Sequence, residues 1–144
     1  MNFKKCAEED LENYRRRLEA IQSIRERIEV LRAGMDVKAV RTDKVAVLGG
    51  ASKAEKNLVN SLYEIEKLKM SLKTTTQLCN IIKKGLDSLS DEEQTVLKIM
   101  YVEPINHPID ELCEMLNISK PQVYRIRDKA LYKFTITCYG LPEI

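Results

Sequence analysis

The residues best suited to contact another molecule are gathered near the carboxyl end of the chain, between Ser119 and Lys133. Five basic residues in this stretch stand against the single acid Asp128, which gives it a net charge of +4, whereas the whole chain of 144 residues carries only +2. A dense group of lysine and arginine attracts phosphates, so such a segment is typical of a nucleic-acid-contacting surface. The alternative is a solvated helix end that touches no partner.

Local signals predict that this stretch is a helix beginning at Ser119. Gln122 follows Ser119 at the spacing of a capping box, and Pro121 falls in the first turn, where a missing N–H leaves no hydrogen bond unmade. Apolar residues then recur at helical spacing and predict a buried face, namely Val123, Ile126, Ala130 and Phe134.

The opposite side of this helix, at about 100° per residue, carries the candidate contact residues. Pro121, Tyr124, Arg125, Asp128 and Tyr132 lie there, with Lys120, Gln122 and Lys129 on the flanks and Ser119 at the start. A helix fits the major groove of DNA, where arginine can bond guanine and glutamine can bond adenine, while lysines neutralise phosphates. We expect Arg125 to read a base and Lys129 to lie near phosphates. Arg127 projects nearer the core and should pair with an acid of a neighbouring helix.

Two shorter helices are predicted before it, so the segment from about Leu86 to Phe134 has the pattern of a helix-turn-helix. Ser90 and Glu93 form another capping box, and Pro104 ends the first helix. The second helix has its apolar positions at Ile109, Leu112, Cys113 and Leu116. Asn117 should occupy the turn between the second and third helices, because asparagine tolerates a left-handed backbone.

The first 85 residues have a different pattern, that of two long helices with one apolar stripe each. We expect the first from about Lys5 to Ala33, a stop at Gly34, a turn ending at Gly49 and Gly50, and the second from about Ala51 to Lys84. Two single stripes must be buried against each other or against a partner, which predicts a coiled-coil-like antiparallel hairpin. Its role is oligomerisation, most simply as a homodimer, or partner binding. A plain structural coiled coil with no ligand is the alternative.

Together these patterns predict an all-α protein of two parts, a helical hairpin in residues 1–85 and a three-helix helix-turn-helix module in residues 86–144. The charges follow the same division. Residues 1–85 carry a net +6, and the stretch from Leu86 to Ile118 carries −7, so the basic character of the module is confined to its last helix.

Few residues in the chain could do covalent or metal chemistry. The four cysteines are far apart without a CxxC pair, and the single His107 has no cysteine at a metal-ligand spacing, so we expect no metal and no cofactor. No paired nucleophile and base, phosphate-binding glycine loop or paired carboxylates are found, which argues against an enzyme. No apolar stretch reaches the roughly 18 residues of a membrane span and no secretion signal begins the chain, so we expect a cytoplasmic protein.

The carboxyl-terminal module resembles the fourth conserved region of sigma factors. The resemblance runs without a gap from Pro108 to Phe134, with Ser119, Val123, Ile126, Ala130 and Leu131 at the framework positions. In that family this helix-turn-helix binds the −35 promoter element, which implies that Lys120, Pro121 and Arg125 face bases here. Phe134 stands where leucine is usual, and Pro121 replaces a residue that could hydrogen-bond, so the family's target sequence does not carry over.

The whole chain, by its architecture and size, also resembles small phage-borne regulators of the ArpU and RinA type. The two resemblances imply a sequence-specific transcriptional regulator of a phage or prophage that binds double-stranded DNA, with the hairpin free for self-association or for contacts to RNA polymerase. The alternative is a protein-interaction module that binds polymerase or another regulator through the hairpin, with little DNA contact. The chain shows no promoter-melting domain, so autonomous sigma activity is not expected.

Overall fold

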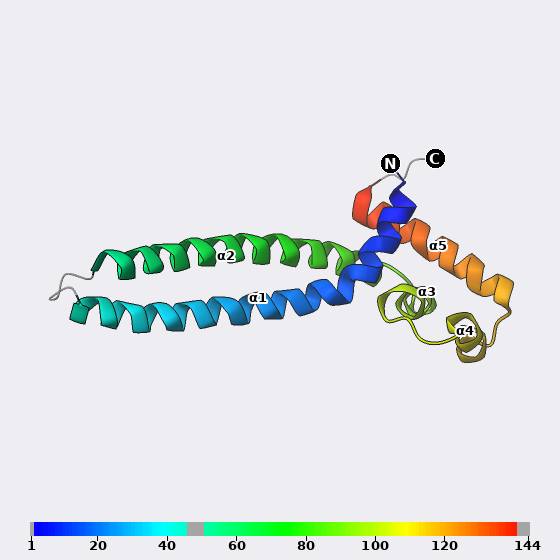
Figure 1. Ribbon diagram of the computed structural model, residues 1–144. Coiled ribbons are helices and arrows are strands. Elements are labelled where there is room, and N and C mark those ends of the chain that lie inside the picture. Colours follow the sequence, from blue (N-terminus) through cyan, green and yellow to red (C-terminus); the bar gives the residue numbers. More distant parts are fainter. Residues whose placement is uncertain (1, 46–50, 141–144) are drawn as a thin grey trace. The chain divides into compact units, whose positions relative to one another are not determined.

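The computed structural model describes residues 2–45 and 51–140, and every regular element in these ranges is a helix (Figure 1). The elements are α1 (Phe3–Val45), α2 (Ala51–Asp87), α3 (Asp91–Leu97), the π-helix η2 (Lys98–Val102), α4 (Pro108–Leu116) and α5 (Lys120–Tyr139). The all-α class predicted from the sequence is therefore confirmed.

The chain divides into two compact units, and both long helices contribute to each of them. Unit 1 consists of the chain up to Leu18 and from Gln77 onward, and unit 2 consists of Glu19–Thr76. The first residues of α1 and the last residues of α2 thus belong with α3, α4 and α5. This division in space differs from the boundary at residue 85 that was predicted from the sequence. The separate roles predicted for residues 1–85 and 86–144 stay a prediction.

The start and the middle of α1 differ from the sequence expectation. Asn2 caps the helix, since its Oδ1 accepts the Lys5 N–H at 3.1 Å, and α1 begins at Phe3. The expected stop at Gly34 is wrong, because α1 continues without a break to Val45. A glycine inside a helix costs only about 1 kcal/mol relative to alanine, which good helix formers on both sides can offset. The turn expected at Gly49 and Gly50 lies outside the described residues.

The larger of two apolar clusters in unit 1 joins the two parts of the chain that form this unit. Its buried members come from α1, α2, the following turn, α3 and α5: Ala7, Leu11, Ile82, Leu86, Leu89, Leu97, Ala130, Leu131 and Phe134. Gly85 lies so close to α5 that a Cβ there would be 2.5 Å from the Cys138 Sγ and 2.8 Å from the Phe134 ring. This contact favours glycine, because a Cβ at this position would force the Cys138 and Phe134 side chains to shift within a packed core.

A second, smaller cluster holds the helix-turn-helix together. Val96 of α3, Leu112 of α4 and Val123 of α5 are fully buried in it, and partly buried apolar residues surround them: Ile99, Met100, Ile109, Cys113, Leu116, Ile118 and Ile126. The core positions predicted for the three short helices are thus buried or half-buried. The cluster fixes the angle at which α5 leaves the turn.

In unit 2, α1 and α2 lie side by side with opposite chain directions (Figure 1). Ile28 and Ile65 are buried between them, and Arg27 Nη2 lies 3.2 Å from Glu64 Oε1. Other large apolar side chains on α2 are exposed, among them Val59 at 63%, Tyr63 at 64% and Met70 at 72%. This unit therefore presents apolar surface that its own two helices do not cover.

Candidate nucleic-acid interface

The turn between α4 and α5 has the geometry that the sequence predicts. Asn117 ends α4 in the left-handed conformation, with φ 53° and ψ 50°, and the Ile118 N–H donates to the Cys113 carbonyl at 3.2 Å. Asparagine adopts this conformation at less cost than most other residues, because its short side chain can hydrogen-bond locally. A single left-handed residue thus sets the direction from α4 to α5.

The first turn of α5 is closed by Ser119 and Gln122. Ser119 has an extended backbone, and its N–H donates to the Gln122 Oε1 at 3.2 Å, which is the return bond of the predicted capping box. Reading adenine with two bonds requires both the oxygen and the nitrogen of a glutamine amide. Because the Gln122 oxygen already accepts the Ser119 N–H, a paired contact to adenine would have to share that oxygen, whereas the amide nitrogen has no such bond.

Every one of the nine candidate contact residues is exposed. They are Ser119, Lys120, Pro121, Gln122, Tyr124, Arg125, Asp128, Lys129 and Tyr132. The opposite face of α5 is closed, because Val123, Ala130 and Phe134 are 0% exposed. The helix therefore has one face in the core and one polar face open to solvent, as the periodicity predicts.

The positive charge of that polar face is smaller than the sequence suggests. Three of the five basic residues between Ser119 and Lys133 are in ion pairs. Lys120 lies 3.4 Å from Asp110, Arg127 lies 2.8 Å from Asp128, and Lys133 lies 3.0 Å from Glu93. Within residues 2–45 and 51–140, Arg125 and Lys129 make no ion pair, so they are the cations best placed to meet an anionic partner.

The ion-pair partner of Arg127 differs from the one predicted from the sequence. We expected a pair with an acid of a neighbouring helix, but its Nε and Nη2 donate to the Oδ1 of Asp128 on the same helix, at 3.0 and 2.8 Å. The guanidinium also lies 4.9 Å from the centre of the Tyr124 ring, a cation–π contact. These two contacts hold Tyr124, Arg127 and Asp128 together along one edge of the polar face.

The first turns of α1 lie beside the same edge. Lys4 Nζ is 3.7 Å from the Asp128 Oδ1, the Tyr101 hydroxyl donates to Glu8 at 3.3 Å, and Tyr139 donates to Asp10. Burial, followed by the nearby Glu8 carboxylate, raises the pKa of Tyr101 to about 12, so the phenol stays protonated as a donor. The packing of α1 beside α5 was not predicted from the sequence, because it joins residues more than a hundred positions apart.

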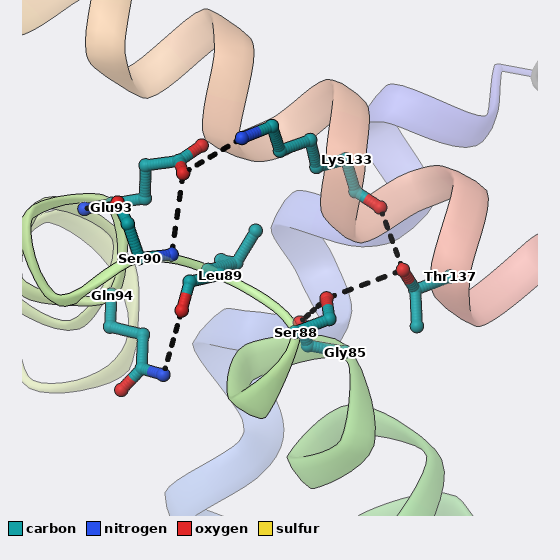
Figure 2. A network of polar contacts seen from close by, with 8 residues as sticks. All are labelled: Gly85, Ser88, Leu89, Ser90, Glu93, Gln94, Lys133 and Thr137. Atoms are coloured by element: carbon teal, nitrogen blue, oxygen red, sulfur yellow. Dashed lines mark hydrogen bonds and ion pairs between the residues drawn. The ribbon is translucent and has the colours of Figure 1, made fainter.

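A polar network joins α5 to the start of α3 (Figure 2). The Glu93 Oε1 accepts from the Ser90 N–H at 3.3 Å and from Lys133 Nζ at 3.0 Å, while Ser88 Oγ lies 3.3 Å from the Thr137 hydroxyl. Burial acts to raise the pKa of the Glu93 carboxyl, but the bonds from Lys133 and Ser90 outweigh it and lower that pKa. The capping box of α3 thereby also fixes the position of α5.

The described residues contain no group of three or more histidine, cysteine or acidic side chains arranged to hold a metal ion. Within the same ranges, no helix contains an apolar stretch long enough to cross a membrane.

Comparison of the chain with protein-family models, with curated proteins and with solved structures gave no match.

Proposed function

We propose that the chain is a sequence-specific, sigma-factor-like transcriptional regulator that binds double-stranded DNA, is encoded by a phage or prophage and acts in the cytoplasm. One observation carries the proposal. α5, which follows α4 in the helix-turn-helix, buries its apolar face and exposes all nine candidate contact residues. A helix presented in this way fits the major groove of DNA. The proposal assigns the chain no reaction and no cofactor.

In this proposal α5 enters the major groove and α4 holds it at the angle set by Asn117. Arg125 is exposed and unpaired with any described acid, so it can donate two hydrogen bonds to the O6 and N7 of a guanine. Lys129, one turn further along α5, contacts a phosphate. Gln122 contributes a single donor rather than the paired contact to adenine, because its oxygen accepts the Ser119 N–H.

The test is binding of the purified full chain to duplex DNA at increasing salt. Lysine and arginine that neutralise phosphates release counterions, so the affinity should fall steeply as salt rises, with a log–log slope of about −0.9 for each phosphate contacted. A footprint on the DNA around the chain's own gene would then locate the preferred site. Failure to bind a broad pool of random duplexes at low salt would overturn the proposal.

The long helices have the role of self-association or of contacts to RNA polymerase in this proposal. A homodimer suits DNA binding, because two copies of α5 could occupy two half-sites about one helical turn apart. Light scattering of the protein at tens of micromolar should give the mass of a dimer. A monomer mass would leave polymerase contact as the role of the long helices.

A second function is favoured by the exposed apolar side chains of unit 2. Val59, Tyr63 and Met70 of α2 are each more than 60% exposed, which suits a protein partner better than a nucleic acid. In this alternative the chain binds polymerase or another regulator through its long helices, with little DNA contact. Salt-dependent duplex binding that is lost in Arg125→Ala and kept in Met70→Ser would favour the first function over this one.

A further inference from the structure

The first turns of α1 are fixed against the carboxyl half of α5. Ala7 and Leu11 are fully buried in the same core as Leu131 and Phe134, and the Phe3 ring centre lies 5.9 Å from that of Tyr139. Phe3, Ala7 and Leu11 recur every four residues, so one face of the first turns of α1 packs against α5 and its core. The amino-terminal residues of α1 therefore keep a defined position beside the candidate DNA-contacting helix.

Polar contacts place the amino end of α1 beside the polar face of α5. The Lys4 ammonium is 3.7 Å from Asp128, one of the exposed candidate residues, while Glu8 is held by the Tyr101 hydroxyl one turn further along. Lys4 consequently lies at the edge where α5 exposes Asp128. Of the acids that follow in α1, Glu8 accepts from the Tyr101 hydroxyl, Glu9 lies a full turn beyond Lys5, and Asp10 is paired with Arg17.

The charges at this edge favour a polyanion. Lys4 and Lys5 are both exposed, and the first turn of α1 contains no acid. Asp128 is the one acid on the polar face of α5, and it is contacted by both Lys4 and Arg127. The single carboxylate thus offsets only part of the charge of these two cations, and the exposed Lys5 follows Lys4 in the same turn of α1.

We propose that Lys4 and Lys5 at the amino end of α1 are a second DNA-contacting element, binding backbone phosphates beside the groove that α5 enters. This proposal rests on the proposed function and extends it, since it adds a contact outside the helix-turn-helix. The phosphates are those of duplex DNA, because Lys4 contacts Asp128 on the same face of α5 that carries Arg125 and Lys129. A site read by α5 would thus be held by backbone contacts from α1 as well.

The experiment measures the affinity of the full chain for a fluorescent duplex of mixed sequence over a range of salt. In a variant with both Lys4→Gln and Lys5→Gln, the affinity should fall about 5- to 50-fold near 0.1 M salt, and the magnitude of the salt slope should fall by between one and two. The variant with arginine at both positions keeps the charges and should bind like the parent. A matched pair of changes in unit 2, Lys53→Gln with Lys56→Gln, removes the same charge elsewhere and should have little effect.

Asp128→Asn separates a phosphate contact from a purely structural role of the ion pair. If Lys4 binds phosphate, the loss of the Asp128 charge frees Lys4 and removes a repulsive group, so DNA binding tightens. If Lys4 serves only to pair with Asp128, then Asp128→Asn weakens binding as Lys4→Gln does, and the proposal is overturned.

Equal losses from the unit 1 and unit 2 lysine pairs would overturn it as well. No duplex binding by the parent chain would defeat this inference together with the proposed function, whereas parental binding that is unchanged in the double glutamine variant defeats this inference alone.

Discussion

Lys133 on α5 lies 3.0 Å from the Glu93 carboxylate, which at the same time accepts the Ser90 N–H at the start of α3. Only 8% of the Glu93 side chain is exposed, whereas 44% of the Lys133 side chain is. The acid is thus the buried partner, and the cation reaches it from the surface. One carboxylate therefore joins the cap of the first short helix to the helix that carries the candidate contact residues.

Removal of the Lys133 charge should leave that carboxylate buried and without its cation. We expect Lys133→Ala to lower the free energy of unfolding by about 2 kcal/mol, the usual size of a hydrogen bond to a charged group with little access to water. Urea denaturation followed by circular dichroism measures it. Lys129→Ala is the matched control and should change stability by less than about 0.5 kcal/mol, because Lys129 is exposed and has no ion pair within the described ranges. Equal effects of the two changes would show that the pair adds nothing.

The stability contributed by Glu93 should depend on pH in the acid range. Its pKa in the folded chain lies below the ordinary 4.5, so the folded state favours the charged carboxylate. The contribution is therefore fully present above about pH 5 and is lost as the pH falls through the folded pKa. We expect the difference in free energy of unfolding between the parent and Glu93→Gln to shrink between about pH 5 and pH 3. A difference that stays constant over this range would contradict the assignment.

Two glycine substitutions should have opposite effects. Gly85→Ala would place a methyl group 2.5 Å from the Cys138 Sγ, so we expect a loss of about 1 to 3 kcal/mol, as for other overpacked cores. Gly34→Ala meets nothing within 4 Å and should instead stabilise α1 by up to about 1 kcal/mol through helix propensity. Thermal unfolding of the two variants measures both. A neutral Gly85→Ala would mean that α2 and α5 can separate without cost.

Substitution of Arg125 and substitution of Lys129 should change the affinity for DNA in different ways. Arg125→Ala should cost about 1 to 3 kcal/mol on the preferred site and weaken discrimination at one base pair, because a base contact is lost. Lys129→Ala should weaken all sequences alike and reduce the salt slope by about one, because a phosphate contact is lost. Titration of each variant with the preferred site and with random duplex distinguishes the two roles. A proportional loss on both DNAs in Arg125→Ala, with helicity unchanged, would make Arg125 another phosphate contact.

The features predicted correctly from the sequence depend on residues close together in the chain. The capping boxes at Ser90 and Ser119 and the left-handed Asn117 are decided within three or four residues, so local patterns suffice for them. The buried face of α5 follows from its own periodicity. These signals place the helix-turn-helix and its exposed face without any knowledge of the rest of the chain.

The features that the sequence left undecided depend on distant contacts. Ala7 and Leu11 fit the apolar stripe of a long helix equally well whether they pack against α2 or against α5, and periodicity cannot distinguish these partners. Arg127 could reach an acid on another helix or on its own, and periodicity does not distinguish these; in the structure it pairs with Asp128 and lies over the Tyr124 ring. Gly34 carries a stop signal that the long helix overrides.

Unit 1 is assembled from both ends of the chain, with Glu19–Thr76 inserted between its two parts. Its core cannot close until Ala7 and Leu11 meet Leu131 and Phe134, which are more than a hundred positions away in the sequence. Contacts between such distant residues carry a large loop-closure entropy and slow folding. Arg27 and Glu64, which pair α1 with α2 in unit 2, are much closer in sequence, so we expect this pairing to form first and to shorten that loop. A fragment that starts at residue 86 would lack the core residues that α1 and α2 contribute, among them Ala7 and Leu11. We expect it to fold less stably than the same residues in the full chain.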